Sequence, residues 1–396
     1  SYIGYDTKEE NASGKSVINV TLTGGMMLDE VQLVGSRSPK RTSTDTAVPV
    51  DVIDIAEVVT QTGRVEVNEL LQYAAPSFNA NKQSGSDGAD HIDPATLRGL
   101  GPDQTLVLIN GKRRHQSSLI NIFGTRGRGN TGTDLNAIPA SAIKRIEILR
   151  DGAAAQYGSD AIAGVINIVL KNQTDKVSGF INYGAYNTNA KGDFPSGTPN
   201  TDGNRLDTEK DGNAIGSDKS FDGGSLKAGV NFGAAIGKDG GFVNVTTEYI
   251  SKNKTLRPGF DFRRGFGEAA IDGFNLMLNA SVPLSDKSEL YAFGGRNYRD
   301  TDAYAFTRNG GNRVIPSIYP NGFTPRITSN IIDNSFSAGF RTELDSGWKL
   351  DISNTYGKNN FHYFIKGTLN ASLEDVSPTD FDAGGHSLTQ NTVNLD

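Results

Sequence analysis

The segment Arg145-Ile-Glu-Ile-Leu-Arg150, together with Ala161-Ile-Ala-Gly-Val-Ile-Asn-Ile168, decides the fold of this chain. Both parts contain short apolar runs rich in β-branched residues, which predict strands at residues 146–149 and 165–170. The run at 161–170 is the longest apolar run, at about ten residues, and it contains Gly164 and Asn167. A membrane-spanning helix needs roughly 20 apolar residues. We therefore expect no helix to cross a bilayer, which leaves a soluble protein or a β-barrel.

Residues 48–171, which surround this segment, predict a mixed α/β globule. Residues 48–55 have a strand-like pattern, and residues 63–71 predict a helix that ends before Ala75-Pro76. Thr105-Leu-Val-Leu-Ile109 predicts a short buried strand, closed by the turn pair Asn110-Gly111. Residues 139–143 are expected to begin a short helix.

From about residue 172 onward, apolar and polar residues alternate over long segments. In residues 226–236, Leu226, Val230 and Phe232 share one face, whereas Lys227 and Asn231 share the other. The same period of two recurs in residues 274–284, 336–344 and 348–352. A lipid-facing apolar side and a polar interior produce this pattern in transmembrane barrels. Strands of a soluble β-sandwich also alternate, but they average about 5–6 residues, whereas these run to ten or more. We count about seven such strands.

The connections between these segments have two different lengths. Residues 237–241, 285–288 and 345–347 predict tight hairpin turns, and the alternate connections at about 187–221, 254–270, 300–329 and 358 onward are long and polar. Short turns on one side and long loops on the other are typical of outer-membrane barrels. Aromatic residues near the strand ends fit a membrane-interface girdle: Trp348, Tyr249 and Tyr356.

Composition argues against several classes of function. The net charge of -6 argues against broad nucleic-acid binding, and there are no cysteines. The four histidines are far apart, have no metal-ligand spacing and are expected on the polar surface. Gly124-Thr-Arg-Gly-Arg-Gly129 lacks the spacing and the strand–helix context of a nucleotide-binding loop. We therefore predict no enzyme, no cofactor and no metal site.

The globular part resembles the plug domain of the TonB-dependent receptor family. A first signature is Leu97-Arg-Gly-Leu-Gly101, followed by the strand at 105–109 and Asn110-Gly111. A second and stronger one comprises Ile138-Pro139, Ile143, Arg145-Ile-Glu-Ile-Leu-Arg150, Ala155, Tyr157-Gly158 and Ala161-Ile-Ala-Gly-Val-Ile-Asn-Ile168. The family usually has Gly-Pro after the arginine, where this chain has Asp151-Gly152. That departure concerns a turn and leaves the domain assignment unchanged.

The N-terminal residues resemble two further parts of this family. Leu28-Asp-Glu-Val-Gln-Leu-Val34 looks like a TonB box inside a polar linker. Ser1-Tyr-Ile-Gly-Tyr5 and Ile18-Asn-Val-Thr-Leu22 look like the end of the carboxypeptidase-regulatory-like domain that many receptors of the Bacteroidetes type carry. A short strand of that preceding β domain is the alternative reading of residues 28–34.

The resemblance implies an α+β plug domain inside a transmembrane antiparallel β-barrel. We expect four parts: the end of the carboxypeptidase-regulatory-like domain (1–23), a linker with the TonB box (24–47), the plug (48–171) and the N-terminal part of the barrel (172–396). Large plugged transporters have about 22 strands. Seven strands would form only the first part of such a barrel, so the chain is expected to be a fragment.

The resemblance also implies a function, which is import of a scarce nutrient through the bacterial outer membrane. TonB, driven by ExbB–ExbD, would pair with the box residues Leu28, Asp29, Glu30, Val31, Gln32, Leu33 and Val34. The plug would face the periplasm, the long loops would be extracellular, and outer-membrane lipid would surround the barrel. Siderophore, cobalamin, oligosaccharide and peptide all remain open as the nutrient.

Two groups of plug residues have expected roles. Structural motif residues are Arg98, Gly99, Glu147, Arg150, Tyr157, Gly158, Gly164 and Asn167, and the charged ones are expected to join plug and barrel. The outward apices are expected at 79–93 and 113–133, and the candidates for binding an anionic substrate are Arg113, Arg114, His115, Arg126 and Arg128. The alternative is that these basic residues bind acidic residues on the inner barrel wall.

Two other functions remain open. The first is a SusC-like glycan or peptide importer, whose partner is a surface lipoprotein that acts as a lid. The second is a structural or signalling subunit of an outer-membrane complex. A neighbouring lipoprotein gene would favour the first, and an additional N-terminal signalling domain would favour the second.

Overall fold

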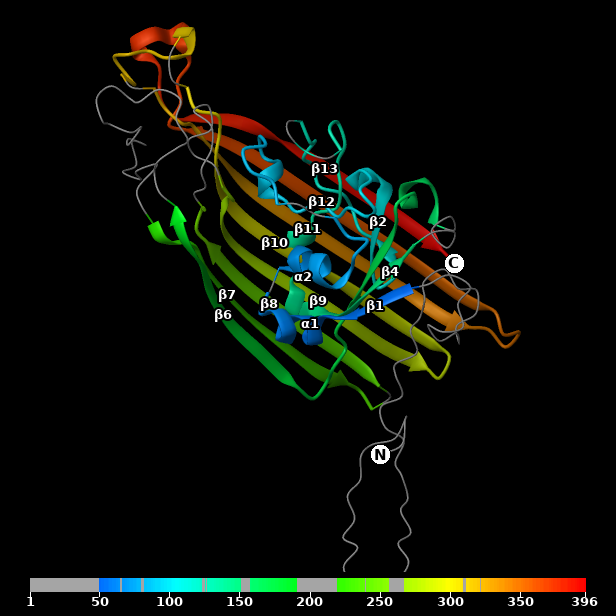
Figure 1. Cartoon of the computed structure of the whole chain (residues 1–396). Coiled ribbons are helices and arrows are strands. Elements are labelled where there is room, and N and C mark those ends of the chain that lie inside the picture. The colour runs from blue at the N-terminus through cyan, green and yellow to red at the C-terminus, as the bar shows by residue number, and fades with distance from the viewer. Residues whose placement is uncertain are drawn as a thin grey trace, which may run out of the picture.

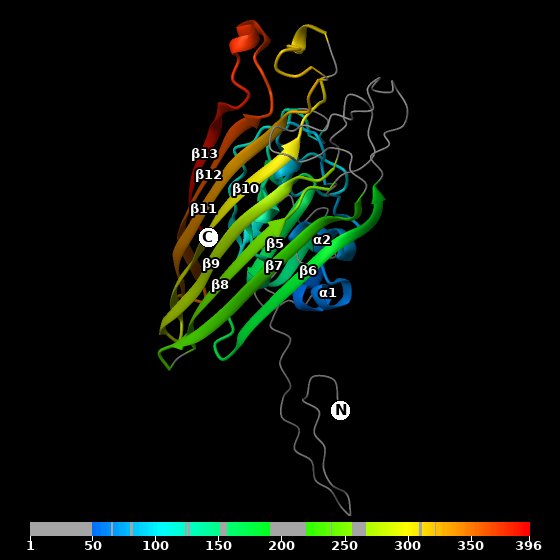
Figure 2. The same cartoon turned by 90° about the vertical axis from the view of Figure 1, so that its left-hand side faces the viewer.

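The computed structural model describes residues 50–64, 66–79, 82–122, 125, 127–150, 157–190, 219–238, 240–255, 267–308, 311–320 and 322–396. These residues form two units. A small α/β unit, residues 50–170, lies against the concave face of a large antiparallel sheet (Figures 1 and 2). We call the small unit the plug and the large sheet the wall.

The plug is built on a five-stranded sheet with the order β1-β4-β5-β2-β3. Its strands are β1 (Val50–Asp54), β2 (Thr105–Ile109), β3 (Lys112–Arg113), β4 (Ile143–Leu149) and β5 (Gly164–Leu170). Strands β2 and β5 are parallel, and the other pairs are antiparallel. Two α-helices follow β1: α1 (Ile55–Thr62) and α2 (Val67–Ala74). The motif strands at 146–149 and 165–170 are thus adjacent central strands of the sheet.

Short 3-10 turns connect the rest of the plug: η1 (Ala89–His91), η2 (Pro102–Gln104), η3 (Leu135–Ala137), η4 (Ala140–Ala142) and η6 (Ser159–Ala161). The short helix that we expected to begin at residues 139–143 is the single turn η4. The helix expected at 63–71 is wrong in its first part. Gly63 has a left-handed φ of 65° and ends α1, and α2 begins at Val67.

The wall is a meander of eight antiparallel strands. They are β6 (Val177–Ala190), β7 (Lys219–Ile236), β8 (Gly241–Lys252), β9 (Ala270–Ser285), β10 (Ser288–Tyr304), β11 (Arg326–Glu343), β12 (Lys349–Lys366) and β13 (Phe381–Leu395). Each strand pairs with its neighbours in sequence, so the short turns lie at one end of the sheet and the long connections at the other (Figure 1).

The expected count of seven strands and the long loop from residue 358 onward are wrong. Strand β12 continues to Lys366, and β13 follows the short turn η9 (Ala371–Val376). In residues 361–365 aromatic or apolar side chains occupy both faces of the strand. On the inward face, Phe361 packs against the plug and is 0% exposed. Strand β13 has polar and glycine residues on both faces. Neither stretch shows the apolar–polar alternation on which the count depended.

The two faces of the wall differ in polarity, as the alternation predicted. Large apolar side chains are exposed on the outward face, among them Leu226, Val230, Phe274, Leu276, Phe336 and Ile352. The inward face buries polar side chains beneath the plug, among them Asn231, Asn275, Arg299, Asp333 and Asn359. An apolar outside and a polar inside fit a membrane-spanning barrel wall. None of the helices in the described part of the chain is long and apolar enough to cross a membrane.

The main hydrophobic core lies in the plug and extends to the wall. Leu70 and Leu71 of α2 pack with Ile146, Ile148 and Ile166 of the central strands. Two wall residues, Met277 on β9 and Phe293 on β10, belong to the same cluster of buried side chains. The plug is therefore seated on the wall by apolar packing as well as by polar contacts.

Candidate functional site

The seam between plug and wall contains most of the buried charges of the described residues. One group surrounds Glu66, which precedes α2 and whose side chain makes no capping hydrogen bond to that helix. Its carboxylate binds Lys82 of the plug and lies 3.6 Å from Nζ of Lys252 on β8. Burial raises the pKa of Glu66, but the two lysine ammonium groups outweigh this effect and hold that pKa below its usual range.

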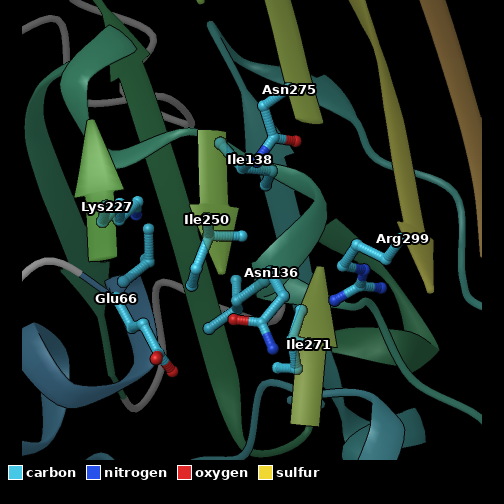
Figure 3. A pocket seen from close by; sticks show the side chains of 10 residues that line it. Glu66, Asn136, Ile138, Lys227, Ile250, Ile271, Asn275 and Arg299 are labelled. Atoms are coloured by element: carbon cyan, nitrogen blue, oxygen red, sulfur yellow. The ribbon is translucent and has the colours of Figure 1, made fainter. Parts of the chain in front are cut away.

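A cavity of about 20 Å³ lies beside Glu66, between α2 and η3 of the plug and strands β7 to β10 of the wall. Its polar lining consists of Glu66, Asn136, Lys227, Asn275 and Arg299, and Ile138, Ile250 and Ile271 contribute apolar surface (Figure 3). Lys227 on β7 forms an ion pair of 3.0 Å with Glu248 on β8. Glu248 also accepts a 2.7 Å hydrogen bond from the backbone N–H of Ser141 in the plug.

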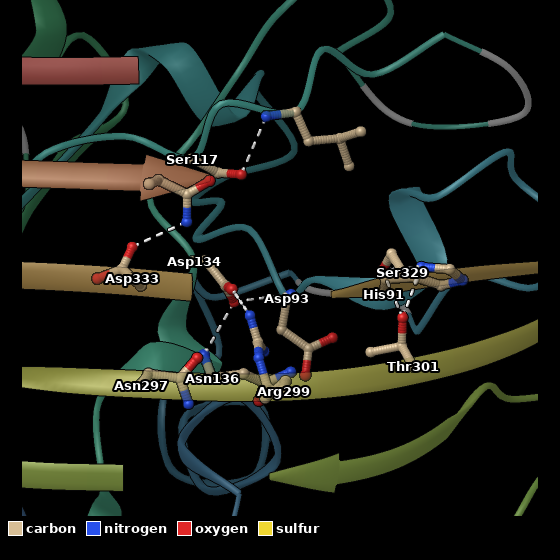
Figure 4. Close-up of polar contacts among 12 residues, drawn as sticks. His91, Asp93, Ser117, Asp134, Asn136, Asn297, Arg299, Thr301, Ser329 and Asp333 are labelled. Carbon is tan, nitrogen blue, oxygen red and sulfur yellow. Dashed lines mark hydrogen bonds and ion pairs between the residues drawn. The ribbon is translucent and has the colours of Figure 1, made fainter. Parts of the chain in front are cut away.

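Arg299 on β10 forms the most deeply buried ion pair across the seam. Its Nη2 group donates to Oδ2 of Asp134, and both side chains are 1% exposed. Oδ1 of Asp134 accepts from the backbone N–H groups of Asn136, at 3.0 Å, and Asp93, at 3.2 Å (Figure 4). Asp134 thus caps η3 and anchors it to the wall at the same time.

Asp93 is the second buried carboxylate at this place. Its Oδ2 atom has no hydrogen-bond partner among the described residues. Burial raises the pKa of Asp93, and the Lys82 ammonium only partly offsets this, so that the pKa is about 6.

His91 lies between the plug and two wall strands, contrary to the expectation of a surface position. Its Nδ1 atom is 2.7 Å from the hydroxyl of Thr301 on β10 and 2.8 Å from that of Ser329 on β11 (Figure 4). Its ring stacks on Phe361 of β12 with centroids 5.9 Å apart. The side chain is fully buried, and this burial lowers the pKa of His91.

Arg114 and His115, which follow β3, meet Asp333 on β11. Arg114 donates to Oδ1, and Nε2 of His115 is 2.9 Å from Oδ2. Asn359 on β12 donates to the same Oδ2 at 2.9 Å, and its own Oδ1 accepts from the backbone N–H of Ser118 at 2.8 Å. Burial lowers the pKa of His115, and the charge of Arg114 adds to that effect. Five residues from plug and wall therefore share one buried network.

Further polar contacts extend the seam toward the end with the short turns. Nδ2 of Asn110 donates to Oδ1 of Asn279 on β9 at 3.1 Å. Nζ of Lys112 is 3.2 Å from a carboxylate oxygen of Asp351 on β12 and 2.9 Å from one of Asp396. The plug thus contacts strands from β8 to β12 through charged or polar side chains.

The charged motif residues Glu147 and Arg150 make contacts inside the plug. Glu147 is 0% exposed and accepts hydrogen bonds from Arg145 Nε, at 2.8 Å, and Asn167 Nδ2, at 2.9 Å. Arg150 binds Asp51 of β1 at 2.7 Å. The expectation that Glu147 and Arg150 join plug and barrel is therefore wrong, because these contacts hold β1, β4 and β5 together.

The remaining motif residues shape the backbone of the plug. Arg98 and Gly99 have left-handed φ angles of 56° and 75° in the turn after Leu97. Gly158 has a φ of 91°. Gly164 has a φ of 138°, and a Cβ atom there would lie 2.6 Å from the carbonyl oxygen of Leu149. Tyr157 is half-buried, which raises its pKa, and its carbonyl oxygen lies 3.5 Å from Nη2 of Arg113.

The candidates for substrate binding are distributed over different surroundings. Arg113 binds Asp160 of η6 within the plug. Arg114 and His115 face the wall, as described above, whereas Arg128 is exposed. Arg126, the whole segment 28–34, residues 1–23 and Asp151-Gly152 lie outside the described residues.

Sequence reasoning missed Asp134, Arg299, His91, Asp93 and Asp333. The wall residues among them are single inward positions of an alternating strand, and their partners are far away in sequence. A charged residue at an inward position, such as Arg299 or Asp333, was the one available signal.

Comparison with known proteins agrees with this architecture. The model of the TonB-dependent receptor plug domain matches residues 42–165. The ferric enterobactin receptor PirA of Pseudomonas aeruginosa is 37% identical over 118 residues, which are 29% of this chain and 16% of PirA. The vitamin B12 transporter BtuB of Vibrio vulnificus is 24% identical over 277 residues, which are 67% of this chain and 39% of BtuB.

Solved structures share the fold of both units. The ferric enterobactin receptor PfeA of Pseudomonas aeruginosa, in complex with enterobactin, superposes with a TM-score of 0.58 at 18% identity, over 87% of this chain and 46% of PfeA. The siderophore receptor PirA of Acinetobacter baumannii gives a TM-score of 0.59 at 19% identity, over 87% of this chain and 44% of that receptor. The chain thus spans less than half the length of these receptors. The solved structures show that the two units have the fold of a receptor plug and of part of a receptor barrel. The plug-domain match and the relatives show that the chain belongs to the TonB-dependent receptors.

Proposed function

We propose that the protein imports a scarce nutrient across the outer membrane with energy delivered by TonB and its ExbB–ExbD motor. The observation that carries the proposal is the plug itself, which is seated on the inner face of the wall by buried ion pairs such as Arg299–Asp134 and Arg114–Asp333. Removing one partner of such a buried pair strongly destabilises the folded protein. A plug held in this way does not leave the barrel spontaneously, so transport requires an input of work.

The arrangement of the plug indicates where that work would act. Among the described residues, the side-chain contacts of β1 and α1 lie within the plug, for example the 2.7 Å bond from Arg150 to Asp51. Directly after α1, the carbonyl oxygen of Gly63 accepts a 3.0 Å hydrogen bond from Asn182 on β6. Among the residues that the structure describes, strand β1 is an edge strand and pairs only with β4 in the plug sheet. A pull on the N-terminal linker would therefore load the β1–β4 pairing first, before the ion pairs of η3 and of the loop after β3. We propose that this edge shifts or unfolds to open a path.

The linker would receive the pull through the box residues Leu28 to Val34, to which TonB would add a strand. In this orientation the N-terminal edge of the plug and the short turns face the periplasm. The long connections and the loop that contains Arg128 face the exterior.

A ferric siderophore is the nutrient that we propose. The relatives named as ferric enterobactin or siderophore receptors support this class, although the identity above 30% is confined to about the plug. Ile120 and Ile122 are both 48% exposed, and Arg128 is exposed as well. The two segments lie close together, because the N–H of Gly129 donates to the carbonyl oxygen of Asn121 at 2.7 Å. An apolar pair next to a guanidinium suits a ligand that has both aromatic surface and negative charge. Arg114 and His115, in contrast, serve the seam with the wall.

The test is uptake of ⁵⁵Fe-labelled siderophores by cells that carry the full-length receptor, with and without TonB. We expect uptake of a ferric catecholate that requires TonB. Uptake of cobalamin or of an oligosaccharide, with no uptake of iron chelates, would replace the siderophore by another nutrient, and the second result would favour the SusC-like importer with a lipoprotein lid. Equal uptake in the presence and absence of TonB would contradict the energised mechanism. A receptor that binds only proteins would favour the structural or signalling alternative.

A further inference from the structure

We infer that the cavity beside Arg299 is a binding site for one water molecule, which joins the wall to the plug. The inference starts from Arg299, which is 1% exposed and reaches from β10 into the seam. Its Nη2 group donates to Asp134, but Nε and Nη1 have no acceptor among the described residues. A buried guanidinium presents five donors, and a buried donor without an acceptor is rare in folded proteins.

The cavity lies where these donors point. Figure 3 shows the guanidinium end of Arg299 directed from its strand toward Asn136, which belongs to the plug. The volume of about 20 Å³ exceeds the roughly 10–15 Å³ that one water requires. Two acceptors are within the lining, the side-chain oxygens of Asn136 and Asn275. Oδ1 of Asn275 already accepts from Asn297 at 2.7 Å, but an amide oxygen has a second lone pair.

Charge decides between water and an ion of similar size. Each of the three charged lining residues already has a partner of opposite sign: Arg299 binds Asp134, Lys227 binds Glu248, and Glu66 binds Lys82. The surroundings of the cavity are thus close to neutral, and the carboxylate of Glu66 in the lining repels an anion. A neutral molecule that accepts from Arg299 and donates to an amide oxygen satisfies the polar groups without adding charge.

The water would join plug and wall through hydrogen bonds that other water molecules can take over. A bridging water forms hydrogen bonds nearly as favourable as direct ones, and it exchanges its partners without leaving a charge unsatisfied. Water could therefore solvate the Arg299 guanidinium when η3 moves away from β10. This inference concerns the seam alone and holds whichever nutrient the receptor takes.

The experiment is a structure of the full-length wild-type receptor at a resolution that shows ordered water. We expect one density peak within hydrogen-bonding distance of Nε or Nη1 of Arg299 and of an amide oxygen of Asn136 or Asn275. A cavity without density, or one that is closed by a protein group bonded to Arg299, would overturn the inference. Crystals soaked in bromide test the identity of the peak, because an anomalous signal at this place would show an anion instead of water.

Two variants give a matched comparison. Arg299→Met removes the two buried donors, Nε and Nη1, that we expect to hold the water, whereas the other lining residues remain. A buried water needs two to four polar partners, so the density at this place should be lost. Arg296→Met changes an exposed arginine on the outward face of the same strand and should retain it. Density that persists in Arg299→Met would contradict the assignment. If that variant does not fold, the wild-type structure and the bromide soak still decide the question.

Discussion

Arg299 of the wall and Asp134 of the plug form an ion pair in which both side chains are almost completely excluded from solvent. Asp134 also receives two backbone N–H groups, so that the wall, η3 and the segment at Asp93 meet at one carboxylate. The contact joins residues that are 165 positions apart in the chain. Its position makes it the first contact to test for the attachment of the plug.

Arg299→Met should lower the free energy of unfolding of the full-length receptor by about 3–5 kcal/mol, because removing one partner of a buried pair leaves the other charge uncompensated. The measurement is the urea midpoint of unfolding in detergent, followed by a probe attached to the plug. The matched control is Asp345→Asn, which removes an ion pair with Lys287 where Asp345 is 98% exposed. The control should change stability by less than about 1 kcal/mol. Equal midpoints for both variants would show that the buried pair does not hold the plug.

This pair also illustrates what the sequence allowed us to predict. The motif strands of the plug follow from residues 138–168, and the orientation of the wall strands follows from alternation, as in Leu226 against Lys227. Both depend on neighbours that are close in sequence. The contacts of Asp134 with Arg299 and of Arg114 with Asp333 depend on which inward position lies under which plug loop. No local period encodes that relation, so the site had to come from the structure.

Strand β13 shows a second limit. Its hydrogen bonds to β12 extend from Ile352 to Ile365, yet its own residues are mostly polar or glycine on both faces. Pairing along the backbone can hold such a strand even where the side chains give no periodic signal. A method based on the alternation of side chains therefore stops at β12.

Asp93→Asn should stabilise the receptor at neutral pH and have no such effect in acid. Burial raises the pKa of Asp93 to about 6, above the ordinary value of 3.8. Between about pH 4 and pH 6, Asp93 of the folded state therefore keeps a proton that the unfolded chain has released. Because of this difference, the free energy of unfolding falls as the pH rises through that window. Asparagine has the same shape and carries no charge, which removes this loss.

The measurement for Asp93 is the melting temperature of wild type and variant at pH 4 and pH 8. We expect the difference between them to grow with pH in favour of Asp93→Asn. Asp175→Asn is the control, since Asp175 is exposed in the connection to β6. A gain at pH 8 that persists unchanged at pH 4 would show that the effect comes from packing and not from the proton.

Gly164→Ala should destabilise the plug more than Gly99→Ala, although both glycines have positive φ angles. A Cβ atom at Gly164 would lie 2.6 Å from the Leu149 carbonyl oxygen and 3.0 Å from Leu97, whereas one at Gly99 would meet nothing within 4 Å. Gly99→Ala should therefore cost about 1 kcal/mol from backbone strain alone. Gly164→Ala adds a clash in the central sheet and should cost about 1–3 kcal/mol more. Chemical unfolding of both variants gives the comparison, and equal losses would mean that β4 and β5 yield to the added methyl group.

Leu33→Pro tests the proposed TonB box in the living cell. Proline removes a backbone donor and disfavours pairing with an added strand, so nutrient uptake should be lost while the receptor still reaches the cell surface. Ser36→Pro, outside the proposed box but in the same polar linker, controls for a general effect of proline and should leave uptake close to wild type. Surface display is measured by antibody labelling of intact cells, and uptake is measured with the labelled ligand. Normal uptake by Leu33→Pro would place the TonB-binding segment elsewhere in the linker. Loss of uptake in both variants would instead mean that proline disturbs the linker in general and that the effect is not specific to the proposed box.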